Sequence, residues 1–258
     1  MAKAKRKAKL VKQGIVTIAT ARKVRDVVKK GLTSGLGVQE PGKMCVEAAV
    51  CYAMGLPHGD NPHCVGSAVR AFKIRLNDAP WSSDQARAKG MLEVAIAQLG
   101  SDKIDQRQFA DLVVVGVIKE ILPIAIRARA KVHPKHAEAL EICAVACEAA
   151  TDRMSARAAA RAARDKMWSF GWTWDAAAAA DAYDAAADAY AVAAAVAYAA
   201  VAYAADAYAA YDAAAVAYAA AYARAAARDS VLSLAAKIAV KALKVCKSQG
   251  VKWLALAA

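Results

Sequence analysis

Residues 175–228 constrain the fold more than any other part of the chain, because they are built almost entirely from one residue type. Of these 54 residues, 34 are Ala, and the other 20 are eight Tyr, six Asp, four Val and two Arg. Ala has the highest helix propensity, and the segment has no Gly or Pro to interrupt a helix. A continuous helix of this length would measure about 80 Å at ~1.5 Å per residue. The segment therefore predicts a long helical rod or a helical hairpin.

This segment is also amphipathic when its residues are placed at about 100° per step. One side carries six tyrosines: Tyr183, Tyr190, Tyr208, Tyr211, Tyr218 and Tyr222. Four Asp residues gather opposite, whereas Tyr198 and Tyr203 lie outside both groups. Ala allows another helix to approach closely, and Tyr adds a large apolar body with a hydroxyl that requires a partner. We expect this Ala/Tyr face to pack on the protein's own helices, on a second copy of the chain, or on another protein or ligand.

No membrane span is expected. Residues 189–205 are 17 uncharged residues, which is the short limit for a spanning helix. They are mostly Ala and contain little of the Leu, Ile or Phe that drives insertion. The apolar stretch at 14–19 is too short for a secretory signal. Six irregularly spaced cysteines fit a reducing compartment, so a cytoplasmic location is predicted.

Positive charge is concentrated at the N-terminus. Lys plus Arg number 36 against 23 Asp plus Glu, but residues 1–30 alone carry eleven basic residues and one acid. Residues 1–13 predict a flexible, solvated tail with six cations: Lys3, Lys5, Arg6, Lys7, Lys9 and Lys12. Such a tail can contact nucleic acid through phosphates without reading sequence. It can also act only as a solubilising segment, or contact the chain's own Asp-rich segment.

Amphipathic spacing predicts an all-α protein with a multi-helix N-terminal domain. The expected helices cover 17–31, 44–54, 67–76 and 82–99, then a helix from 102 that Pro123 either kinks or ends, and a helix from 133 to 150. Ser82 and Gln85 have capping-box spacing for the fourth of these. The predicted organisation is a tail at 1–13, a helical domain at 14–150, Ala-rich long helices at 151–229, and a C-terminal amphipathic helix at 230–258 that packs back on the core.

Residues 45–64 contain the side chains that are the best candidates for catalysis or metal binding. Cys45 begins a predicted helix, where the helix dipole lowers a thiol pKa, so it is a candidate nucleophile. His58 or His63 would be its base, and Asp60 or Asp78 would orient that base. Cys45, Cys51, His58, His63 and Cys64 match no common zinc spacing, so no metal or cofactor is predicted. The remaining alternative is a set of small core thiols and a hydrogen-bonded loop.

Three stretches of the chain carry a resemblance to other proteins. They are the helix that begins Cys-Val-Glu-Ala-Ala-Val-Cys-Tyr-Ala at Cys45, the later Leu-Asn-Asp-Ala-Pro-Trp-Ser-Ser, and the Ala-Gln-Leu-Gly that ends at Gly100. They resemble uncharacterised bacterial and phage-type proteins with a Cys-containing small-residue helix, an Asn-Asp turn and an Ala-rich helical tail. The resemblance covers residues 35–150 and, loosely, the tail. It implies a helical fold and supplies no catalytic residues.

These patterns together predict a non-catalytic interaction or scaffold protein. The Ala/Tyr face would serve self-association or partner binding, and the basic tail would add electrostatic attachment to a polyanion. The alternative is a small cytosolic enzyme or ligand-binding protein that uses residues 45–64.

Overall fold

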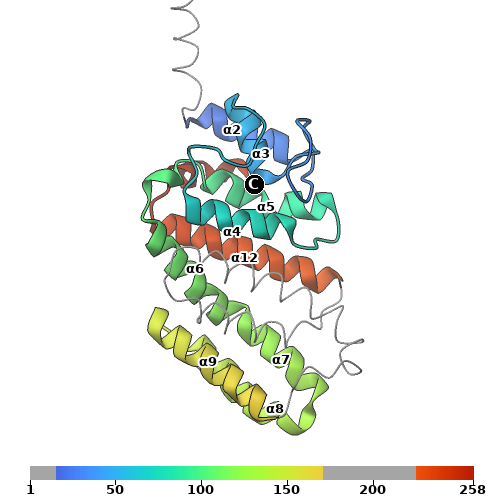
Figure 1. Ribbon diagram of the computed structural model, residues 1–258, viewed down its shortest axis with the longest axis vertical. Coiled ribbons are helices and arrows are strands. Elements are labelled where there is room, and N and C mark those ends of the chain that lie inside the picture. The colour runs from blue at the N-terminus through green and yellow to red at the C-terminus, as the bar shows by residue number, and fades with distance from the viewer. Residues whose placement is uncertain (1–15, 171–224) are drawn as a thin grey trace, which may run out of the picture.

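The computed structural model describes residues 16–170 and 225–258 (Figure 1). Over these residues the chain forms helices and loops, and its one β-type contact is an isolated antiparallel bridge between Gly37 and Met44. The all-α prediction is therefore confirmed for the described part of the chain. The basic tail, the Ala/Tyr face and the choice between rod and hairpin lie outside the described residues.

A first layer of helices encloses the larger apolar core. It contains α2 (Ile18–Val28), α3 (Val46–Met54), α4 (Ser67–Asp78), α5 (Asp84–Ala97), α12 (Ala225–Val245) and the 3-10 helices η1 (Ser101–Lys103) and η3 (Gln249–Leu256). Figure 1 shows α2 and α3 at one end of the molecule, with α4 and α12 below them. α12 packs on α5 and α6, and η3 packs on α5 and α2. The C-terminal helices α12 and η3 therefore lie against the first layer.

A second layer forms around a smaller core. Its helices are α7 (Leu122–Val132), η2 (Pro134–His136), α8 (Ala137–Glu148) and α9 (Arg153–Ser169), and α6 (Gln106–Glu120) links the two layers. Buried Ala156, Ala160 and Ala163 let α9 approach the other helices closely. The Arg127 guanidinium on α7 pairs with Glu141 and Glu148 of α8, which joins these two helices at the surface.

Local sequence signals explain most helix ends. The Thr17 hydroxyl caps α2 in a reciprocal arrangement with Thr20. Gly55 ends α3 with φ of 69°, the left-handed conformation that favours glycine. The predicted cap at Ser82 is wrong by one residue, because Ser83 is the N-cap of α5. Ser82 instead donates two hydrogen bonds, from its backbone N–H and its hydroxyl, to the Asp229 carboxylate.

Two further boundaries differ from expectation. Asn77 and Asp78 are the last residues of α4 rather than part of a separate turn. Helix α12 runs through Asp229 and Ser230 without a break, although a new helix was expected to begin there. Within the described ranges, none of the helices is long and apolar enough to cross a membrane.

Candidate functional site

The most elaborate polar arrangement surrounds the connection between α2 and α3, residues 29–45, which we call the α2–α3 loop. Gly31, Gly35, Gly37 and Gly42 all have positive φ, so the loop turns sharply four times. The tip of the loop is closed by a hydrogen bond of 2.9 Å from the Val38 backbone N–H to the Lys43 carbonyl. Further backbone hydrogen bonds within the loop join Thr33 to Met44 and Cys45 to Leu36, and side chains of the surrounding helices add support to them.

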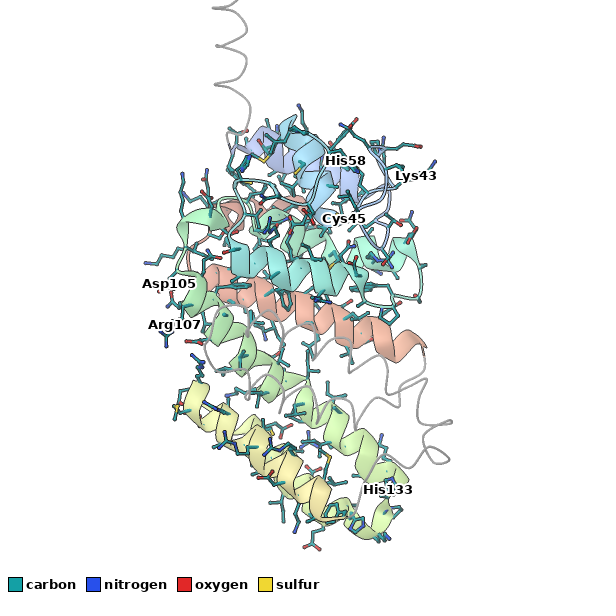
Figure 2. All side chains as sticks on the ribbon, viewed as in Figure 1. Lys43, Cys45, His58, Asp105, Arg107 and His133 are labelled. Carbon is teal, nitrogen blue, oxygen red and sulfur yellow. The ribbon has the colours of Figure 1, made fainter. Side chains whose placement is uncertain are left out.

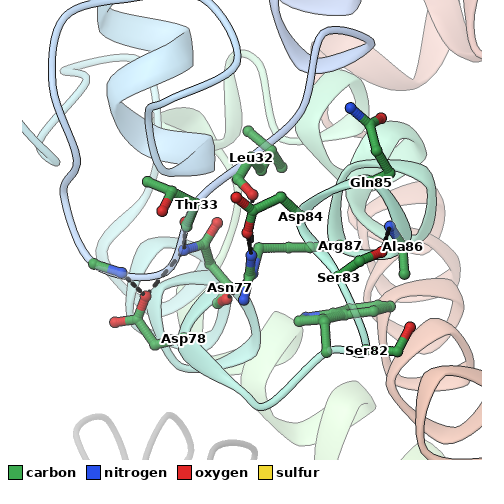
Figure 3. Close-up of polar contacts among 12 residues, drawn as sticks. Leu32, Thr33, Asn77, Asp78, Ser82, Ser83, Asp84, Gln85, Ala86 and Arg87 are labelled. Carbon is green, nitrogen blue, oxygen red and sulfur yellow. Dashed lines mark hydrogen bonds and ion pairs between the residues drawn. The ribbon is translucent and has the colours of Figure 1, made fainter. Parts of the chain in front are cut away.

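The end of α4 supplies much of that support (Figure 3). The buried Asn77 amide donates to the Thr33 carbonyl at 2.9 Å and accepts from the Val46 backbone N–H at 3.1 Å. The neighbouring Asp78 carboxylate accepts from the Gly35 N–H at 2.7 Å. The last turn of α4 therefore holds one end of the loop and the first turn of α3 at the same time.

Arg87 on α5 completes this network from the other side. Its guanidinium donates to the Asn77 carbonyl at 2.7 Å and to the Leu32 carbonyl at 3.0 Å, and it also pairs with Asp84. Only 6% of Arg87 is exposed. A cation is favourable here because it lies at the carbonyl end of α4, where the helix dipole is negative. The sequence pattern alone did not identify Arg87 or Asn77 as residues that hold the α2–α3 loop.

His58 supports the tip of the same loop. Its Nε2 donates to the Gly37 carbonyl at 3.1 Å, and its Nδ1 is buried without a hydrogen-bond partner among the described residues. Two of the candidate catalytic residues, His58 and Asp78, thus both bind the backbone of the α2–α3 loop. In the described structure their hydrogen bonds join that loop's backbone and Asn77, not the Cys45 thiol.

Cys45 is the N-cap of α3, as its position suggested. Its sulfur accepts from the Ala48 N–H at 3.3 Å, and its own N–H donates to the Leu36 carbonyl at 3.2 Å. Burial raises the pKa of this thiol, and the opposing effect of the helix N–H groups is smaller. The expected lowering of the Cys45 pKa is therefore wrong, because the side chain is only 5% exposed and desolvation disfavours the thiolate.

The other candidates of this block are dispersed between core and surface. Asp60 and His63 are exposed, while the Cys64 thiol is buried and donates to the Met54 sulfur at 3.3 Å. Burial raises the pKa of Cys51 to about 12 and that of Cys64 to about 11. Over residues 16–170 and 225–258, no three His, Cys, Asp or Glu side chains are grouped to hold a metal ion.

A buried ion pair between Glu47 on α3 and Lys73 on α4 is the feature that sequence analysis missed. The Lys73 Nζ lies 2.7 Å from Glu47 Oε1, and both side chains are fully buried. The second Glu47 oxygen has no hydrogen-bond partner in the described structure. Burial raises the Glu47 pKa and lowers the Lys73 pKa, and the charge of each partner opposes the shift of the other.

A signal for this pair was present in the spacing of α4. Val69, Phe72 and Leu76 form its buried face, and Lys73 follows Val69 by four residues, so it falls on the same face. A lysine at such a position requires a buried partner, because an isolated ammonium in an apolar core is very costly.

Comparison with known proteins adds no external assignment: no family model, curated protein or solved structure matches this chain. The function must therefore be inferred from the chemistry of the residues themselves.

Proposed function

We propose that this protein acts by binding, as an interaction or scaffold protein of the cytoplasm, and not by thiol catalysis. The observation that carries this proposal is the engagement of Cys45, His58 and Asp78 with backbone groups of the α2–α3 loop and of α3. A nucleophilic cysteine must be accessible and able to ionise. Cys45 has the opposite properties, since it is buried and its pKa is raised.

The proposed binding surface is the Ala/Tyr face, and the proposed partner is a second copy of the chain or another protein. The exposed apolar side chains of α8 and α9 offer a further contact surface within the described residues. Ile142 is 65% exposed, Val145 is 51% exposed, and Met154 at the start of α9 is 73% exposed. Large apolar side chains that gather on neighbouring helices are typical of protein contact surfaces. The basic tail at 1–13 would add attachment to a polyanion.

The test is the molar mass and shape of the full chain, measured by light scattering and small-angle X-ray scattering across protein concentration in low and high salt. Nucleic acid must first be removed. We expect an elongated oligomer whose mass rises with concentration. Replacing Tyr208 and Tyr218 with Ser should lower that mass, whereas replacing Tyr198 and Tyr203, outside the Ala/Tyr face, should not. A monomer at all concentrations, or equal effects of both double variants, would contradict the proposal.

The second candidate function is a small enzyme or ligand-binding protein that uses residues 45–64. The buried Glu47–Lys73 pair favours it, because strongly perturbed titratable groups are concentrated at functional sites. The two candidates differ in the reactivity of Cys45. Under this second function, iodoacetamide would modify Cys45 rapidly at neutral pH in the folded protein, as read by peptide mass spectrometry. Under the binding proposal, modification of Cys45 would require unfolding.

A further inference from the structure

Helix α2 presents two chemically different faces. Its inner face, Ala21, Val24, Val27 and Val28, is buried in the first layer. Its outer face, continued by the residues that follow the helix, carries four exposed cations: Arg22, Lys23, Lys29 and Lys30. Within the described residues, none of these four forms an ion pair.

The only acid on α2 does little to neutralise that face. The Asp26 carboxylate pairs with Arg25 at 2.7 Å, so its charge is already matched by a neighbour. Lys43 on the α2–α3 loop, at the same end of the molecule in Figure 2, is likewise matched by Glu40 at 3.1 Å. Four unmatched positive charges therefore remain on one side of α2.

Their spacing is suited to a linear polyanion. Arg22 lies on α2 and Lys29 is its C-cap with helical backbone angles, so these two residues, seven apart, lie on the same side about 10 Å from each other. Lys23 follows Arg22 on the helix, and Lys30 follows the cap. Duplex DNA carries one charge per ~1.7 Å of its axis, so a span of about 10 Å offers roughly six phosphates. We propose that the outer face of α2 binds the phosphodiester backbone of nucleic acid, independently of base sequence.

The burial of the inner face is the reason to choose nucleic acid over a membrane. A helix that binds a lipid surface inserts its apolar side between the headgroups. In α2 that side is already packed in the protein core, with Ala21, Val24 and Val28 at 0% exposure. Ile18, 44% exposed, is the one large apolar side chain that α2 leaves at the surface, so contact is mainly through charge, and phosphate contacts of that kind give affinity without sequence information.

This inference goes beyond the proposed function because it places polyanion binding on a folded element. The sequence before α2 is also basic, with six Lys or Arg residues at 1–13, which lie outside the described residues. Figure 1 shows α2 at the end of the molecule opposite α8 and α9, so changes on the outer face of α2 leave the exposed apolar residues of those helices in place.

The test is fluorescence anisotropy with a labelled 20-base-pair DNA duplex of each of two unrelated sequences, using the full chain at several salt concentrations. Neutralising the four cations, as R22Q/K23Q/K29Q/K30Q, should reduce the slope of log affinity against log salt by about 3.6, which is 0.9 for each lost phosphate contact. Affinity should fall at least tenfold at 0.1 M salt, and equally for both sequences. Because the four side chains are exposed, the melting temperature should remain close to that of the wild type.

The matched control removes four exposed lysines from other elements: Lys89, Lys103, Lys131 and Lys135. This variant has the same net charge as the α2 variant but keeps the outer face of α2, so it should retain most of the slope. Equal losses in both variants would show that only net charge matters and would overturn the proposal. An α2 variant that binds like the wild type would also overturn it, as would binding to phosphatidylserine vesicles without binding to either duplex.

Light scattering on the same samples separates this proposal from the proposed function. Loss of DNA binding in the α2 variant with an unchanged oligomer mass would support the α2 surface alone. A monomeric wild-type chain that still binds DNA through α2 would contradict the proposed self-association and leave this inference supported.

Discussion

The Glu47–Lys73 ion pair should be much more costly to break than to replace. At 2.7 Å and an effective dielectric constant near 20, the attraction of the two charges is about 6 kcal/mol. Removing each ion from water costs several kcal/mol, so the intact pair contributes little net stability. In Lys73→Met the attraction is lost but the Glu47 carboxylate stays buried. We expect that variant to lose about 3–5 kcal/mol of unfolding free energy.

The double variant Glu47→Leu/Lys73→Met is the matched control. It replaces both charges with apolar side chains of similar size, and such replacements are often neutral or stabilising. We therefore expect the double variant to unfold within about 1 kcal/mol of the wild type. Urea unfolding followed by circular dichroism would measure both values, provided that the m-value is unchanged. A single variant as stable as the wild type, or a double variant as unstable as the single one, would refute the reasoning.

The pH dependence of the unfolding free energy tests the Lys73→Met variant independently. Burial already raises the Glu47 pKa in the wild type, and loss of the Lys73 charge removes the largest opposing effect. A carboxyl whose pKa is raised in the folded state makes its most favourable contribution to the unfolding free energy below its ordinary pKa. That contribution is lost as pH rises through the pKa of the folded state. Lys73→Met should thus be less destabilised at pH 5 than at pH 8. The opposite trend would show that the carboxylate is not buried.

Three other predictions concern the α2–α3 loop, the hydrogen bonds between Ser82 and Asp229, and the cysteine thiols. Gly37→Ala should cost at least 1 kcal/mol more than Gly35→Ala in urea unfolding, because both have φ near 70° but only at Gly37 would the new methyl overlap backbone. Asp229→Ala, which removes both hydrogen bonds from Ser82, should cost about 1–2 kcal/mol, and equal stability would mean that these bonds are not formed. A thiol reagent at pH 8 should react with the half-buried cysteines before the buried ones, a pattern that reversed kinetics would contradict. The half-buried cysteines are Cys143 and Cys246.

Helix positions in the described part of the chain were predictable because they depend on local rules. Amphipathic spacing predicted the helix at 17–31, which corresponds to α2, and the helix predicted at 44–54 ends at Met54, as α3 does. Local rules also gave the break at Pro123, which lies in the first turn of α7. They misplaced the cap of α5, because the partner of Ser82 is Asp229, 147 residues away in the sequence.

The roles of individual polar side chains were not predictable for the same reason. Whether Asp78 orients a base or holds Gly35 depends on the course of the α2–α3 loop, because the hydrogen bond between Gly35 and Asp78 joins residues 43 positions apart. The Cys45 pKa depends on two opposed effects, and position at a helix N-terminus reveals only one of them. The larger effect is burial, which is set by the packing of the surrounding helices.

The interpretation of this protein as a binding molecule rests on where its polar chemistry is used. A catalytic site needs polar groups that are free to meet a substrate. Here Asn77, Asp78, Arg87 and His58 all bind backbone of the α2–α3 loop, and their effect is to fix its shape. Among the side chains that the described part of the fold leaves exposed are the outer cations of α2 and the apolar residues Ile142, Val145 and Met154 of α8 and α9. Those two surfaces have different chemistry and lie at opposite ends of the molecule, so each can be altered without disturbing the other.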